Sequence, residues 1–271
     1  MSDVRCARVG WIPALVILGL SSVAAAADDP IVEKLEHGEV NWTTKTVVAT
    51  GSGAPNLKLE NVAAVRLNAE RAAKVDAYRN VLEALKGVKI TAGEPGSKAL
   101  ENAQVRAQVQ GILRGCKTVD TRYYSDGGVD VVVRCALDGG LATTLSPVKS
   151  YKKVKMDGEA KYTGLIIDAV GTTAKPALKP RVLDDKGEPV YEAAMVGPSV
   201  LRQRGTASYA RTVDEAKQNQ LVGKSPLVVK ASALGEVASD IQISGEDAAA
   251  LRNVNQTFLA EARVVIVTDG P

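Results

Sequence analysis

The sequence predicts an α+β fold made of two small mixed domains. Runs with helical periodicity and short strand-like runs are interspersed along the chain, and turn signals typical of β-hairpins occur in both halves. The alternative, a doubly wound parallel sheet, requires regular alternation of strands with helices. The hairpins favour α+β, and the first domain is expected to pack a long helix on an antiparallel sheet with a C-terminal hairpin.

The N-terminus has the three parts of a cleaved secretory signal. Arg5 and Arg8 precede an apolar run over residues 12–27, with Ala25 and Ala27 at the small-residue positions of the cleavage site. This run is shorter than the roughly 20 apolar residues of a membrane-spanning helix. We expect cleavage after Ala27 and a periplasmic mature chain without a lipid anchor, because no cysteine lies at the cleavage point.

Composition divides the rest of the chain at a lysine-rich stretch with Pro147 and no clear period. A charged stretch after the signal is expected to be a loose lead-in. The predicted divisions are a signal peptide over 1–27, the lead-in over 28–39, a first α+β domain over 40–140, a linker over 141–161 and a second α+β domain over 162–271.

The first domain is predicted to begin with a strand over 40–49 and to continue with a helix that ends at Gly87. Asn56 or Asn61 is expected to cap this helix. A short strand follows, and then a second helix from Lys98 to Leu113. The expected buried face of the long helix consists of Ala64, Leu67, Val75, Tyr78, Leu82 and Leu85.

Gly51 and Gly53 lie between the predicted strand and the long helix, where a glycine pair sometimes cradles a phosphate. The stretch lacks the Lys-Ser/Thr of a P-loop and the third glycine of a dinucleotide fingerprint. Pro55 removes a backbone N–H donor just beyond them. The two glycines are therefore interpreted as a flexible corner between strand and helix, not as a ligand site.

Two cysteines flank a predicted hairpin in the first domain. Cys116 and Cys135 stand at the ends of two alternating runs joined by Ser125-Asp126-Gly127-Gly128. Folding on this turn brings the cysteines nearly opposite each other, so a disulfide is favoured over two buried thiols in an oxidising compartment.

The second domain also contains recognisable local signals. Asp184 and Asp185 precede Lys186 and Gly187, and this pattern favours a hairpin turn over a calcium loop. Thr212 and Ser244 open two capping boxes that predict helices. The predicted strands are 162–170, Pro226–Leu234 and Arg263–Thr268.

Several functional classes are disfavoured by composition. The chain carries 34 basic and 31 acidic side chains, a net charge of +3, whereas nucleic-acid binders show a clear basic excess. The only histidine, His37, lies in the lead-in, and no G-x-S-x-G elbow is present. We therefore expect a protein that is not an enzyme and has no cofactor, metal ion or nucleic-acid partner.

Residues 45–140 resemble a known family. The stretch "GSGAPN", the helix "RLNAERAAKVDAYRNVLE" and the hairpin "GILRGCKTVDTRYYSDGGVDVVVRC" look like the bacterial envelope lipoprotein family that includes the flagellar outer-membrane protein P (FlgP), with a related domain in flagellar assembly protein T (FlgT). The positions that carry the resemblance are Gly51, Gly53, Pro55, Glu70, Arg71 and Gly127.

This resemblance implies a structural or assembly role in the cell envelope. Members build rings or discs at the flagellar base near the outer membrane, so self-association or docking on other envelope or flagellar proteins is expected. The alternative is a periplasmic binding module for a glycan, lipid or small molecule. Its groove would be lined by Trp42, Tyr123 and Tyr124, unless these aromatics pack in the core.

Overall fold

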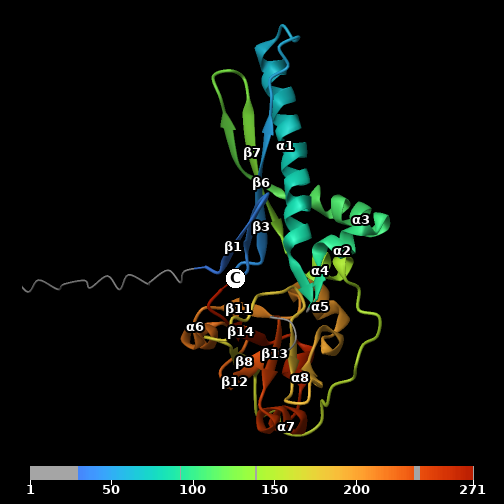
Figure 1. Ribbon diagram of the computed structural model, residues 1–271, viewed down its shortest axis with the longest axis vertical. Helices are drawn as coiled ribbons and strands as arrows, with labels where there is room; N and C mark the ends of the chain where they lie inside the picture. Colours follow the sequence, from blue (N-terminus) through green and yellow to red (C-terminus); the bar gives the residue numbers. More distant parts are fainter. Residues whose placement is uncertain (1–29, 92, 138, 235–238, 271) are drawn as a thin grey trace, which may run out of the picture.

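The protein consists of two units that follow one another along the chain (Figure 1). The structure is a computed structural model that describes residues 30–270 apart from 92, 138 and 235–238. The predicted signal peptide over 1–27 lies outside the described residues. The first unit is built on a five-stranded sheet and the second on a seven-stranded sheet. Helices and antiparallel or mixed sheets in both units confirm the predicted α+β class.

The first unit has a fully antiparallel sheet with the strand order β1-β2-β3-β7-β6. A short β4-β5 hairpin lies between its helices. The elements are β1 (Val32–Leu35), β2 (Gly38–Asn41), β3 (Thr46–Gly53), α1 (Val62–Gly87), β4 (Lys89–Thr91), β5 (Glu94–Pro95), α2 (Gly96–Glu101), α3 (Ala103–Leu113), β6 (Lys117–Tyr123), β7 (Val129–Ala136) and α4 (Gly139–Leu145).

The longest helix, α1, has 26 residues and therefore spans about 39 Å. Asn61 caps it by accepting hydrogen bonds from the backbone N–H groups of Ala63 and Ala64. Of the two predicted cap residues, Asn61 is therefore the one that caps α1. Figure 1 shows α1 projecting away from the second unit together with β3 and the β6–β7 hairpin. We call α1, β3, β6 and β7 the arm.

Two predictions for the start of the first unit are wrong. The lead-in over 28–39 contains β1 and the start of β2, which pair as an antiparallel hairpin. The predicted strand over 40–49 is two strands, because the chain reverses between β2 and β3. The side chain of Asn41 accepts the backbone N–H of Thr44, and Lys45 has a positive φ of 51°. These local turn preferences override the alternating pattern.

Two predicted boundaries after α1 also differ from the structure. The helix expected over Lys98–Leu113 is divided into α2 and α3, since Asn102 caps α3 by accepting the N–H groups of Gln104 and Val105. The linker expected from 141 begins later, because α4 extends to Leu145 and buries apolar side chains. The following segment runs along the second unit, where the Lys152 N–H donates to the Ala194 carbonyl.

The second unit has a mixed sheet with the order β10-β9-β13-β12-β8-β14-β11. Four neighbouring pairs are parallel, and the β10–β9 and β12–β13 pairs are antiparallel. The elements are β8 (Gly164–Asp168), β9 (Arg181–Leu183), β10 (Pro189–Tyr191), a 3₁₀ turn (Ala193–Met195), α5 (Pro198–Arg204), β11 (Ser208–Ala210), α6 (Val213–Gln218), β12 (Pro226–Leu234), β13 (Asp240–Ile243), α7 (Gly245–Asn253), α8 (Thr257–Ala260) and β14 (Val264–Val267).

The local signals predicted for the second unit are present. The β9–β10 hairpin turns through Gly187, which has a φ of 81°. The Thr212 hydroxyl accepts the Glu215 N–H at the start of α6, and Ser244 accepts the Asp247 N–H at the start of α7. Strand β14 is fully buried and lies between β8 and β11.

The two units pack against each other through a shared hydrophobic core. Trp42 meets Tyr209 edge-to-face, with ring centroids 5.8 Å apart. A Cβ on Gly139 of α4 would lie 1.5 Å from the Leu201 carbonyl oxygen, so α4 and α5 can approach only because this position is glycine. The base of the first unit is thus part of the same core as the second unit.

Candidate functional site

Gly51 and Gly53 lie inside β3, directly beneath α1. A Cβ on Gly53 would be 1.9 Å from the Ala69 carbonyl oxygen, and one on Gly51 would be 2.0 Å from the Ala77 nitrogen. Any side chain would collide with the helix backbone, so both positions require glycine for close packing. Their interpretation as a flexible corner is wrong. The corner itself follows β3, in the segment before α1.

The buried face of α1 matches these glycines. It is a ridge of Ala69, Ala73, Ala77 and Val81 at four-residue spacing, all completely buried. The sequence-based prediction of this face is wrong at Leu67 and Val75, which are 48% and 64% exposed, and right at Leu82 and Leu85. Small side chains occupy the contact with Gly51 and Gly53 because the helix backbone lies so near the strand there, and Leu67 and Val75 face outward.

Side chains of α1 also complete the hydrogen bonding of β3. Strand β2 pairs only with the first residues of β3 and leaves the edge beyond them open. The Asn80 side-chain amide donates to the Thr50 carbonyl at 2.8 Å, and the Ser52 N–H donates to the Asp76 carboxylate at 3.1 Å. A covered edge of this kind is protected from pairing with another strand.

The tip of the arm joins three residues of the predicted motif. Gly127 has a φ of 90° in the turn of the β6–β7 hairpin, and it lies against Pro55 and the Val65 side chain. The Tyr123 hydroxyl donates to the Glu70 carboxylate at 3.0 Å, which raises the pKa of the tyrosine. Helix α1 and the hairpin are therefore connected at the tip as well as along β3.

A second polar contact fixes the hairpin to β3. The Tyr124 hydroxyl donates to Asp130 at 2.6 Å, and the Ser52 hydroxyl donates to the same carboxylate at 2.7 Å. The two hydrogen bonds, that from Tyr124 first, hold the pKa of Asp130 below its usual value. The two donors, Tyr124 and Ser52, are exposed, so this contact contributes orientation more than stability.

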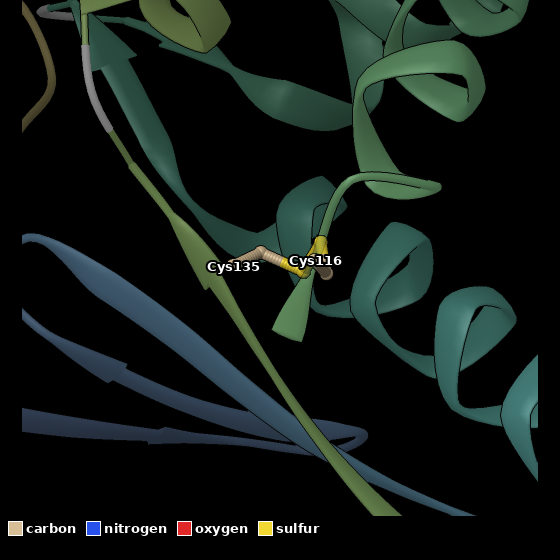
Figure 2. Close-up of a disulfide and its surroundings, with 2 residues drawn as sticks. All are labelled: Cys116 and Cys135. Carbon is tan, nitrogen blue, oxygen red and sulfur yellow. A yellow bond between two sulfur atoms is a disulfide. The ribbon is translucent and has the colours of Figure 1, made fainter. Parts of the chain in front are cut away.

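The predicted disulfide is present. Cys116 and Cys135 are bonded, with Cα atoms 4.6 Å apart. Figure 2 shows the bridge between the chain that enters β6 and strand β7. Since Lys117 pairs with Arg134 in the sheet, the two cysteines stand at matched ends of the hairpin, as the sequence indicates.

The outward side of α1 carries an exposed stripe. It consists of the exposed Leu67, Arg71 and Val75, with the half-buried Ala64 and Tyr78 at its ends. The five residues follow one another at steps of three or four. Leu67 also lines an open groove of about 580 Å³ between the start of α1 and Tyr123. Arg71, the one motif position not yet described, is exposed within this stripe. We call these five residues the α1 stripe.

The predicted aromatic groove does not form. Trp42 is buried beside Tyr209 at the base of the first unit. Tyr123 pairs with Val129, which lies opposite Gly53 at the far end of β3. Trp42 follows Asn41, which pairs with Thr46 at the opposite end of β3, so the length of β3 separates these aromatics by roughly 25 Å. Trp42, Tyr123 and Tyr124 therefore cannot line one groove.

The positions considered for metal binding have other roles. Asp184 accepts the N–H groups of Lys186 and Glu188 and pairs with Arg252, as a turn residue does. Within the described part of the chain, no cluster of three His, Cys, Asp or Glu residues is placed to hold a metal ion. The same residues contain no helix that is long and apolar enough to cross a membrane.

Two lysines at the junction of the units have no counterpart in the sequence-based predictions. Lys45 donates to the Arg204 carbonyl at 2.7 Å, and burial lowers its pKa to about 8. Burial also lowers the pKa of Lys179 to about 8. Neither stands out from the other lysines in sequence, because its burial depends on segments that are distant along the chain.

Comparison with known proteins identifies a similarity for the second unit. Residues 164–270 match the family described as Treponema pallidum Tp0624, second domain. The matched segment runs from the start of β8 to just beyond β14 and so coincides with the seven-stranded sheet and its helices. No curated protein matches the chain. The arm lies outside the matched residues, so its resemblance to the FlgP-containing family remains a prediction.

Proposed function

We propose that this chain is an exported, non-enzymatic protein of the bacterial envelope that self-associates through its arm. Its role is structural or in assembly, at the flagellar base and near the outer membrane. The observation that carries the proposal is the α1 stripe, in which Leu67 and Val75 are exposed on either side of Arg71, on a helix whose opposite face is fixed to the sheet. The resemblance of residues 45–140 to envelope proteins supports it.

The α1 stripe is suited to contact a second copy of itself. Leu67 and Val75 lie four residues to either side of Arg71. If two α1 helices pack antiparallel about Arg71, Leu67 of each copy meets Val75 of the other, which gives a self-complementary contact. Steps of three and four residues are also the spacing of packed helix seams. The long Arg71 side chain can extend from the contact into water.

The arm holds α1 in a fixed position for this contact. The glycine–alanine packing, the hydrogen bonds to the β3 edge and the Tyr123–Glu70 contact restrain the helix along its length. An ordered helix loses little conformational freedom on binding, which favours association.

Light scattering on the chain from residue 28 onward tests this proposal. We expect the unmodified protein to have a mass of at least two chains, and the double variant Leu67→Glu, Val75→Glu to have the mass of one. The matched control is Val228→Glu, because Val228 is similarly exposed on β12 of the second unit. A monomeric unmodified protein, or a double variant that still assembles, contradicts self-association through the arm.

The envelope and flagellar parts of the proposal have separate tests. Fractionation should recover the mature chain with the periplasm or the outer membrane. A strain that lacks the protein should lose motility. Expression of the unmodified protein in that strain should restore motility, and expression of the double variant should not. Normal motility in the deletion strain would contradict the flagellar role. The envelope role would then be tested by the fractionation alone.

A further inference from the structure

A basic cleft lies where the first unit meets the second. It has a volume of about 330 Å³ and lies beside α4 and the segment that follows it. Its lining residues with polar or charged side chains are Thr91, Ser146, Lys149, Ser150, Lys152, Lys179, Arg181 and Glu192. They come from β4, from the segment after α4 and from the neighbourhood of β9 and β10, so both units build the cleft.

Lys179 is an unusual feature of this cleft because its side chain is buried. Only 3% of the residue is exposed, and its ammonium group donates a hydrogen bond to the Ser146 carbonyl. An ammonium group has three donors and is costly to bury without an anion. No carboxylate of the described residues lies within ion-pair distance of it, although Glu94 is near enough to act through its charge. Lys179 lines the cleft, and its ammonium group has further donors beyond the one that the Ser146 carbonyl accepts.

The other cations of the cleft fall into two groups. Lys152 pairs with Glu192 at 2.7 Å, and Arg181 binds Asp240 through two donors. Lys149 is exposed and forms no ion pair with any described residue. The charge available to a ligand therefore comes from the exposed Lys149 and the buried Lys179.

We propose that this cleft binds a phosphate group, carried by a small phosphoester or by a lipid headgroup, with Lys149 and Lys179 as its cationic donors. Arg181 is already engaged with Asp240, so the cleft offers no free guanidinium fork for planar carboxylate recognition. It offers compact ammonium groups and the hydroxyls of Thr91 and Ser150, which suit a tetrahedral oxyanion. The volume exceeds that of a lone phosphate, which leaves room for the ester.

Calorimetric titration of the chain from residue 28 onward with glycerol 3-phosphate tests the proposal. Lys149→Ala is the main variant, because this exposed side chain can be removed without disturbing the core. We expect it to weaken binding about tenfold or more. The matched control is Lys153→Ala, since Lys153 is exposed on the same segment but does not line the cleft. Its affinity should stay within about twofold of the unmodified protein.

Two further arms distinguish the source of the phosphate and its selectivity. Cosedimentation with phosphatidylglycerol vesicles, against phosphatidylcholine vesicles, detects a headgroup ligand. Binding to either phosphate source that Lys149→Ala weakens supports the proposal. Equal effects of Lys149→Ala and Lys153→Ala, equal binding of acetate, or no binding of either phosphate source overturns it. The inference does not rest on self-association, so the Leu67→Glu, Val75→Glu variant should bind as the unmodified protein does.

Discussion

The arm and the second unit are stabilised in different ways. In the second unit, β8 and β14 bury large aliphatic side chains on both faces, including Leu165, Ile166 and Ile167. In the arm, α1 meets β3 through alanine and glycine, and the opposite side of the helix is exposed. The centre of the second unit therefore depends on buried apolar volume, whereas the contact between α1 and β3 in the arm depends on close backbone approach and hydrogen bonds. These two regions should respond oppositely to changes in side-chain size.

Removal of volume should affect the second unit most. Ile166 is completely buried in β8, so Ile166→Ala is expected to lower the free energy of unfolding by about 4 kcal/mol. In the arm, Ala77→Gly should cost about 2 kcal/mol, from the difference in helix propensity and the loss of one buried methyl group. Urea denaturation of both variants measures the two costs. Similar losses would contradict the contrast between the units.

Addition of volume should affect the arm most. Gly53→Ala is expected to cost about 3 kcal/mol, because the new Cβ would lie 1.9 Å from the Ala69 carbonyl oxygen. Gly111→Ala is the matched control: Gly111 lies in α3 with no atom within 4 Å of an added Cβ. This control should be neutral or more stable by up to about 1 kcal/mol. Thermal denaturation compares them, and a tolerated Gly53→Ala would refute the close packing of α1 on β3.

The disulfide should matter to the arm alone. Replacement of Cys116 and Cys135 by serine should lower the free energy of unfolding of the arm by about 3 kcal/mol. This is the value expected for a loop closed by cysteines 19 residues apart. Hydrogen exchange should then rise in β6 and β7 and stay unchanged in β8 and β14. A uniform rise across both sheets would mean that the arm and the second unit unfold together.

Helix caps provide the smallest effects and should not distinguish the units. Asn61→Ala at the start of α1 and Ser244→Ala at the start of α7 each remove a side-chain acceptor of a backbone N–H. Each should cost about 1 kcal/mol. Chemical denaturation measures both, and a much larger loss at Asn61 would show that the arm depends on the first turn of α1 more than its packing indicates.

Features set by neighbouring residues could be predicted from the sequence. The Asp126-Gly127-Gly128 turn fixes the hairpin, and the hairpin fixes the separation of its cysteines. The capping residues Thr212 and Ser244 act within one helical turn, so their pattern is sufficient.

Features set by distant contacts could not be predicted. Periodicity placed Leu67 and Val75 on the buried face of α1, since it measures hydrophobicity and not how near β3 approaches. That approach depends on Gly51 and Gly53, whose role is visible only when the helix lies on the strand. The cleft around Lys179 likewise joins β4, the segment after α4 and the start of β9, which are far apart in sequence.

Cross-linking at the centre of the α1 stripe tests self-association through the arm most directly. In the antiparallel pair, Arg71 of one copy faces Arg71 of the other, so an Arg71→Cys variant should form a disulfide-linked dimer under mild oxidation. Lys217→Cys on α6 is the control, as this exposed position lies in the second unit. A dimer from Arg71→Cys, with the control remaining monomeric on a non-reducing gel, is the expected result. Equal cross-linking of both variants, or none at position 71, would contradict a contact through the α1 stripe.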